Sequence, residues 1–121
     1  MKIAAVNACI AEVRRNLGEA LITTNIVGLQ DGQAIARHNS DAKLEAIVAQ
    51  ITTFLRDVLK NTEIRKMGEY YFIHLDNNTA GVFITFDEYV WTVIIDTTKT
   101  SMGMMLNVYM PDMIEQFKAA L

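Results

Sequence analysis

Residues Asp41 to Lys60 read DAKLEAIVAQITTFLRDVLK and carry no charged side chain between Ala46 and Leu55. Apolar residues recur every three or four positions, which predicts an α-helix. One broad stripe on this helix is made of large residues: Leu44, Ile47, Val48, Ile51, Leu55, Val58 and Leu59. A second stripe, roughly opposite the first, is made of small residues: Ala42, Ala46, Ala49 and Thr53. A surface helix normally keeps one polar face, so we expect this helix to be covered on both sides.

The large stripe is expected to pack on a sheet of the same chain, and two explanations remain open for the small stripe. Alanine and threonine can simply be neutral residues on an exposed helix face. Alternatively, small side chains allow a second helix to approach closely, and that helix could belong to another copy of the chain. A twofold interface is self-complementary, so one stripe would supply both halves of it.

The residues before this helix have the pattern of a helix followed by a β-hairpin. Apolar positions from Ile3 to Leu17 recur at helical spacing, and Gly18 follows where such a helix would end. The run from Leu21 to Val27 is rich in β-branched residues and predicts a strand, and Ala34–His38 predicts its return strand. Asp31-Gly32 lies between them and tolerates the positive φ of a tight hairpin turn.

Three strands are predicted after the central helix, at Glu69–Leu75, Ala80–Phe86 and Val90–Ile95. Short polar turns join them, so neighbouring strands should run antiparallel. The third strand is the most apolar and is expected at the centre of the sheet. A last helix should begin after Ser101, and Pro111 should kink or restart it. Its methionines suit either a core or an adaptable recognition surface.

This order of elements predicts one domain, residues 1–121, of the α+β class. Its single five-stranded antiparallel sheet should carry the Asp41–Lys60 helix on one face and the first and last helices on the other, in the order α-β-β-α-β-β-β-α. The Glu69–Leu75 strand, EYYFIHL, is apolar on both faces. A bare edge of this kind invites pairing, and a second copy of the chain could supply the partner strand.

The composition excludes several classes of function. The net charge is -3 and no more than two basic residues are adjacent, which argues against a nucleic-acid footprint and against a polybasic membrane patch. No window of 18 apolar residues exists, so no membrane span is expected. Cys9 is the only cysteine, so no intrachain disulfide can form. The apolar run at the start of the chain is too short for an export signal, and we expect a cytoplasmic protein.

No set of residues with catalytic, cofactor-binding or metal-binding spacing is visible. His38 and His74 have no carboxylate or thiol beside them at the spacing of metal ligands. Cys9 lies among alanines and is interpreted as a buried apolar residue. Asp87-Glu88 and Asp96 are interpreted as turn residues rather than a cation site. Nucleotide-binding glycine motifs are absent, so an enzyme is the least supported interpretation.

Two segments resemble the roadblock / dynein-light-chain domain family, including its bacterial members that resemble gliding-polarity GTPase activators. The first is the hairpin ALITTNIVGLQDGQAIARHNS (20–40) leading into the central helix, and the second is YYFIHLDNNTAGVFITFDEYVWTVIID (70–96). The resemblance runs from about Ile3 to Leu121. One departure is Pro111, because a smooth final helix is more usual in the family. It implies a dimeric scaffold or regulator, not an enzyme, that binds a small Ras-like GTPase and in some members stimulates GTP hydrolysis.

The resemblance also implies where partners would bind. The dimer, with a second copy or a paralogue, would use one set of residues from the central helix and the edge strand: Ala42, Ala46, Ala49, Gln50, Thr53, Tyr70 and Phe72. The GTPase would dock on the platform formed by two central helices, through Lys43, Arg56 and Lys60. No cofactor is implied. The alternative is a sensor domain of the PAS or profilin-like type, which would need an internal pocket for a small ligand.

Overall fold

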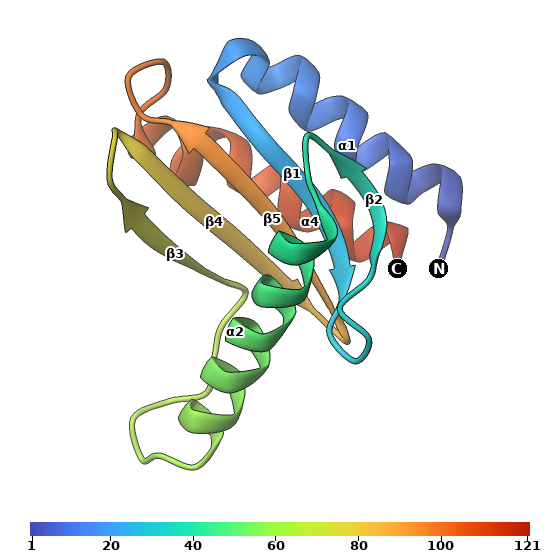
Figure 1. Cartoon of the computed structure of the whole chain (residues 1–121), viewed down its shortest axis with the longest axis vertical. Coiled ribbons are helices and arrows are strands. Elements are labelled where there is room, and N and C mark those ends of the chain that lie inside the picture. The colour runs from blue at the N-terminus through green and yellow to red at the C-terminus, as the bar shows by residue number, and fades with distance from the viewer.

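The computed structural model describes residues 1–121 as a sheet with helices on both faces (Figure 1). The elements in chain order are α1 (Ile3–Leu17), the 3₁₀ turn η1 (Gly18–Ala20), β1 (Leu21–Gly28), β2 (Ala34–His38), α2 (Ala42–Lys60), β3 (Tyr70–Leu75), β4 (Thr79–Phe86), β5 (Tyr89–Asp96), α3 (Met102–Met104), the π-helix η2 (Met105–Tyr109) and α4 (Met110–Ala120). The predicted fold class and element order are therefore confirmed.

The five strands form one antiparallel sheet in the order β2-β1-β5-β4-β3. The strand predicted to be central, β5, lies between β1 and β4. Strands β2 and β3 form the two edges, so the strand with apolar residues on both faces is an edge strand.

The β1–β2 turn follows from its sequence and positions α2. Gly32 has a φ of +69°, and its amide donates to the Gly28 carbonyl at 2.9 Å. The carboxylate of Asp31 accepts a hydrogen bond from the Gln33 amide at 3.0 Å. A Cβ atom on Gly32 would lie 3.4 Å from the Cα of Ala46. The turn therefore rests directly against α2.

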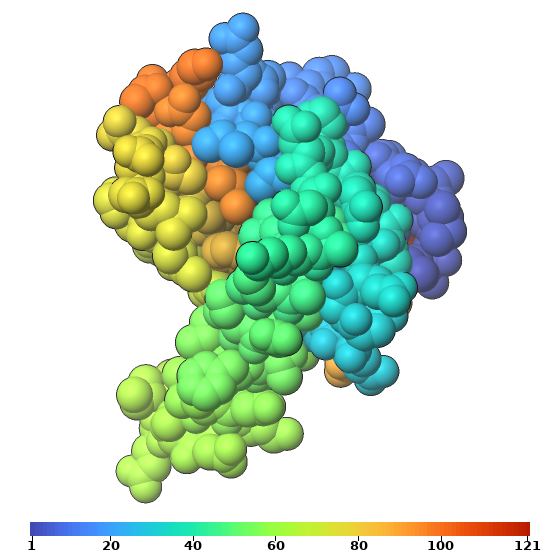
Figure 2. Space-filling model, viewed as in Figure 1, coloured from blue at the N-terminus to red at the C-terminus, as the bar shows by residue number.

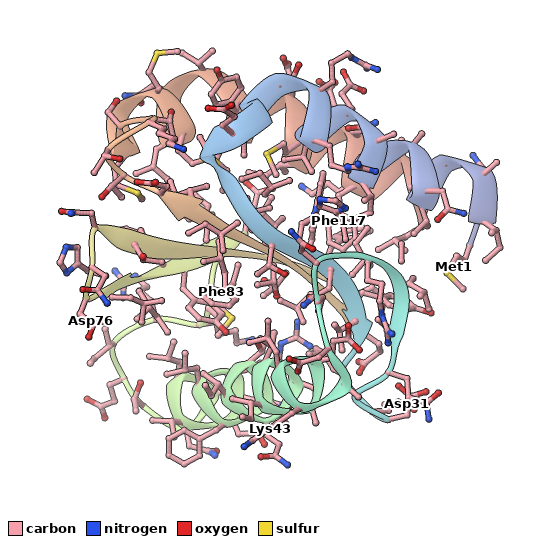
Figure 3. All side chains as sticks on the ribbon, turned by 45° about the horizontal axis from the view of Figure 1, so that its top comes forward. Met1, Asp31, Lys43, Asp76, Phe83 and Phe117 are labelled. Carbon is pink, nitrogen blue, oxygen red and sulfur yellow. The ribbon has the colours of Figure 1, made fainter.

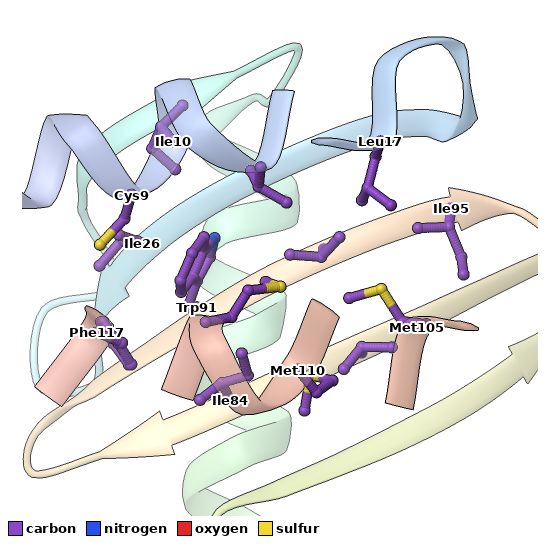
Figure 4. Close-up of a cluster of buried hydrophobic side chains, with 14 of the residues drawn as sticks. Cys9, Ile10, Leu17, Ile26, Ile84, Trp91, Ile95, Met105, Met110 and Phe117 are labelled. Atoms are coloured by element: carbon purple, nitrogen blue, oxygen red, sulfur yellow. The ribbon is translucent and has the colours of Figure 1, made fainter. Parts of the chain in front are cut away.

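The face under α1 and α4 holds the main core, a cluster of 19 buried residues that includes Trp91, Phe117 and Met110 (Figure 4). The Trp91 and Phe117 rings are tilted with centroids 5.6 Å apart, and the Trp91 Nε1 donates to the Thr24 hydroxyl at 2.9 Å. The other face, under α2, holds a cluster of only five: Val27, Val48, Ala49, Phe83 and Val90. Figure 3 shows Phe83 and Phe117 on opposite sides of the sheet.

The final helical segment changes its geometry before Pro111. The Ser101 hydroxyl caps α3 by accepting from the Met104 amide at 3.0 Å, and the π-helix η2 then leads into α4. Pro111 lies in the first turn of α4, directly after the π-helix. The predicted restart is confirmed. Met105, Met110 and Met113 are buried, so most of the methionine cluster belongs to the core.

Helix α2 is rotated relative to the sequence prediction. Its buried residues are Glu45, Val48, Ala49 and Thr52. Large residues of the expected sheet-facing stripe are instead exposed: Ile47, Ile51 and Val58. Ala49, expected on the outer side, is buried against the sheet with 4% exposure. The sheet supplies the bulk on this face through the stacked rings of Tyr71 and Phe83, so small residues of α2 fit above it.

Candidate interaction surface

An exposed apolar stripe runs along the outer side of α2. Its members lie four, three and four residues apart: Ile47, Ile51, Phe54 and Val58. Their exposure ranges from 38% at Ile51 to 67% at Phe54. Figure 2 shows α2 lying on the outside of the molecule, with its C-terminal half extending beyond the sheet. A contiguous exposed apolar stripe is typical of interaction surfaces, and we call it the α2 stripe.

The N-terminal half of α2 is held by a buried polar network. The Glu45 carboxylate is 1% exposed and accepts from the Arg37 guanidinium and from the Ser40 hydroxyl, each at 2.7 Å. The Asn25 side-chain amide in turn donates to the Ser40 hydroxyl at 2.9 Å. Asp41 caps the helix by accepting from the Leu44 amide at 2.8 Å. The charge of Glu45 is therefore compensated, and the start of α2 is fixed on β1 and β2.

A second contact joins the middle of α2 to the edge strand. The hydroxyls of Thr52 and Tyr71 are 2.6 Å apart, and the Tyr71 ring stacks on Phe83 with centroids 4.7 Å apart. Burial raises the pKa of Tyr71, and the hydrogen bond from Thr52 partly opposes that rise. No residue of α2 beyond Thr52 is fully buried. The C-terminal half of the helix therefore projects from the body, as Figure 1 shows.

The edge strand β3 exposes aromatic side chains. Tyr70 and Phe72 are both exposed, and in the register Phe72 lies opposite Val82, whose side chain belongs to the main core. These two residues therefore lie on the same face as α1 and α4. Strand β3 pairs only with β4, so its outer backbone groups have no strand partner.

The residues predicted for the dimer do not form one outer face. Ala42, Gln50 and Thr53 are exposed and Ala46 is half-buried, whereas Ala49 lies beneath the helix. Ala46, Gln50 and Thr53 line a shallow groove of about 420 Å³ beside the β1–β2 turn. The small stripe thus faces the hairpin, and its flank meets the α2 stripe at Phe54, which lines the same groove. Phe54 belonged to neither predicted stripe, and its spacing with Ile47, Ile51 and Val58 is the signal that could have identified it.

The cations predicted to contact a GTPase lie near opposite ends of α2. Lys43 is exposed in the first turn, on the side of the helix away from the sheet (Figure 3). Arg56 and Lys60 line an open hollow of about 540 Å³ at the other end of the helix. The helical rise places Lys43 ~20 Å from Arg56. One protomer alone does not bring these three cations together.

The residues considered for catalysis or metal binding are dispersed. His38 and His74 lie on the two opposite edge strands, and no group of three potential metal-ligating side chains is present. Cys9 is buried, as predicted, and burial together with the nearby Glu12 carboxylate raises its pKa to about 11. A thiol with that pKa is a poor nucleophile.

The surface hollows and the helices bear on two further predictions. Each of the five hollows opens to solvent, so the enclosed pocket that a sensor domain needs is absent. None of the helices combines the length and apolar character that a membrane span requires.

Comparison with known proteins gives matches among solved structures only. No protein-family model and no curated protein matches the chain. MglB of Myxococcus xanthus superposes with a TM-score of 0.78 at 15% sequence identity, over 98% of this chain and 92% of that one. A roadblock/LC7 domain from Streptomyces avermitilis gives 0.75 at 11% identity, over 93% and 94% of the two chains. An MglB in a tetrameric arrangement gives 0.70 at 12% identity, over 98% and 93%. The protein therefore has the fold of MglB and the roadblock/LC7 domains over nearly its whole length, as the sequence resemblance implies.

Proposed function

We propose that this protein is a dimeric scaffold or regulator without catalytic residues of its own, which binds a small Ras-like GTPase. The observation that carries the proposal is the α2 stripe, an apolar surface that a soluble monomer would leave in water. The unpaired edge of β3 supports it, because both features are satisfied by a second copy of the chain. The roadblock/LC7 fold supports the choice of a GTPase as the further partner.

In the proposed dimer, two α2 helices cross antiparallel about a twofold axis with their stripes in contact. Each stripe residue is roughly half exposed, so burying the stripes of both protomers contributes ~8 kcal/mol. Association costs ~4–15 kcal/mol in lost freedom, so this burial alone does not give a tight dimer. Pairing of the two β3 edges, with Tyr70 and Phe72 beside them, supplies the rest. Gln50 lies at the rim of this contact, one turn from Phe54.

The antiparallel crossing also explains how the separated cations could act together. The centre of the stripe lies between Ile51 and Phe54, so the start of one α2 falls beside the end of the other. Lys43 of one protomer would then lie level with Lys60 of the partner subunit along the crossing, although Arg56 and Lys60 lie on the flank of α2 that faces away from the α2 stripe. Each end of the two-helix platform would carry cations from both protomers. This is the surface on which we expect the GTPase to dock.

The proposal is tested by measuring mass and copurification. Light scattering should give twice the chain mass at micromolar concentration, and Phe54→Glu should give a monomer, because the substitution buries an unpaired carboxylate. Val108→Glu is the matched control, since Val108 is an exposed apolar residue on η2, in the opposite layer. It should remain a dimer. The dimer should also copurify with a small GTPase loaded with GDP or a GTP analogue.

Two results would contradict the proposal. If the folded parent protein has the mass of a monomer at every concentration, the proposed dimer is wrong. If the Phe54→Glu variant remains a dimer, the α2 stripe is not the dimer interface, even if the GTPase still binds.

A further inference from the structure

The hollow of about 540 Å³ at the end of α2 has a distinct charge pattern. It lies between the C-terminal half of α2, the connection from α2 to β3, the β4–β5 turn and α4. Four of its lining residues are basic and two are acidic: Arg56, Lys60, Lys66, Lys118, Glu69 and Asp87. The lining therefore carries a net positive charge in a protein whose own charge is -3. We call this site the basic hollow.

Only one of its four cations has a partner within the chain. The Lys118 ammonium pairs with the Glu69 carboxylate and lies 5.7 Å from the centre of the Phe86 ring. Arg56, Lys60 and Lys66 form no ion pair. Like charges gathered at one place repel one another and are relieved by an anionic partner. Asp87 is the one other carboxylate in the lining, and it forms no ion pair with these three cations.

The arrangement of the cations favours an extended chain over a compact anion. Arg56 and Lys60 are one helical turn apart, so their Cα atoms are separated by ~6 Å along α2. Alternate residues of an extended strand lie ~7 Å apart on the same side. Met67 and Phe86 add apolar surface to the lining, which suits the body of a peptide rather than a free phosphate. We propose that the basic hollow binds an extended segment of a partner protein in which alternate residues are Asp or Glu.

The basic hollow stays accessible in the proposed dimer. Arg56 is two residues from both Phe54 and Val58, which places it ~200° around the helix from these stripe residues. An acidic segment could therefore bind while the α2 stripe is covered by the second copy. The inference rests on the proposed function only in expecting that the GTPase carries this segment.

The test uses the full-length protein and a fluorescent peptide of alternating Glu and Ser. Anisotropy titrations at low salt should show binding that weakens as salt is added. Arg56→Gln/Lys60→Gln should weaken it about tenfold, since two charge contacts are lost. Arg14→Gln/Arg15→Gln is the matched control, because it removes the same charge from exposed residues of α1 and should change little.

A variant with the opposite effect makes the test stricter. Asp87 lines the basic hollow at the β4–β5 turn and repels an acidic peptide. Asp87→Asn should therefore tighten binding. Circular dichroism of every variant checks that the fold is retained.

Three outcomes would overturn the inference. The first is that a peptide with Gln in place of Glu binds equally well. The second is that the two double variants lose the same peptide affinity. The third is that inorganic phosphate displaces the peptide at micromolar concentration. Copurification separates this inference from the proposed function. If the peptide binds as expected and no GTPase copurifies, only the proposed function fails. If a GTPase copurifies equally with both double variants and the peptide does not bind, only this inference fails.

Discussion

Replacing Arg37 by methionine tests how α2 is held on the sheet. The Glu45 side chain is 1% exposed and that of Arg37 is 52% exposed. The substitution keeps an apolar stem but leaves the Glu45 carboxylate with the Ser40 hydroxyl as its one remaining partner. Breaking a fully buried ion pair costs ~3–5 kcal/mol, whereas an exposed pair contributes ~0.2–1 kcal/mol. This pair is half open to water, so we expect the free energy of unfolding to fall by ~2 kcal/mol.

The double variant Arg37→Met/Glu45→Met separates this explanation from a simple loss of packing. It leaves no charge in the interface between α2 and the sheet, and replacing a buried pair by apolar residues is often neutral. We therefore expect it to lie within ~1 kcal/mol of the parent protein, so the effects of the two substitutions are strongly non-additive. Arg14→Met is the control, because Arg14 is exposed on α1 and forms no ion pair.

Urea unfolding followed by the fluorescence of the buried Trp91 measures these differences. All variants are compared at one protein concentration, because the stability of a dimer depends on concentration. An Arg37→Met variant within ~0.5 kcal/mol of the parent would refute the reasoning, since that is the range of an ordinary surface substitution. A double variant as unstable as the sum of its single substitutions would refute it as well.

Three further predictions concern stability. The pKa of Cys9 is about 11 in the folded protein and 9.0 for a free thiol. The unfolded chain therefore loses this proton at lower pH, so the free energy of unfolding should fall as the pH rises from 9 to 11. Cys9→Ala should flatten this part of the Tm–pH profile. Tyr71→Phe should lower the free energy of unfolding in urea by ~1–2 kcal/mol, because it leaves the buried Thr52 hydroxyl without a hydrogen bond. Tyr70→Phe, at an exposed position, should cause no measurable change. Gly32→Ala should cost ~1–2 kcal/mol, because alanine disfavours a φ of +69°; Gly68→Ala, at a site with open space, should have little effect on the urea midpoint.

The strands and the antiparallel pairing of chain neighbours could be predicted because their signals are local, whereas the pairing of β1 with β5 joins distant segments and does not follow from them. Asp31-Gly32 specifies a tight turn by its backbone preference alone, and the polar turns after β3 and β4 fix antiparallel neighbours. The most apolar run is the central strand β5, whose side chains belong to the cores on both faces of the sheet. These properties depend on a few adjacent residues and not on the rest of the chain.

The rotation of α2 could not be predicted in the same way. Periodicity finds the apolar sides of a helix but does not say which side meets the sheet. That choice depends on Tyr71 and Phe83, which stack beneath the helix from two strands formed later in the chain. It also depends on Arg37, which compensates Glu45 only once β2 lies beside the start of α2. The same limit applies to the basic hollow, whose cations come from three separate elements.

The observed rotation gives α2 two different exposed flanks. Had Ile47, Ile51 and Val58 packed on the sheet, the outer side of the helix would have been small and polar, with little free energy to gain from a second copy. Placing Val48, Ala49 and Thr52 inward leaves the apolar stripe outward and puts Arg56 and Lys60 on the remaining flank. An apolar contact and a charged contact with different partners can then form on one helix without competing for the same residues. The projecting half of α2, which has no fully buried residue of its own, is where both contacts add the most to its stability.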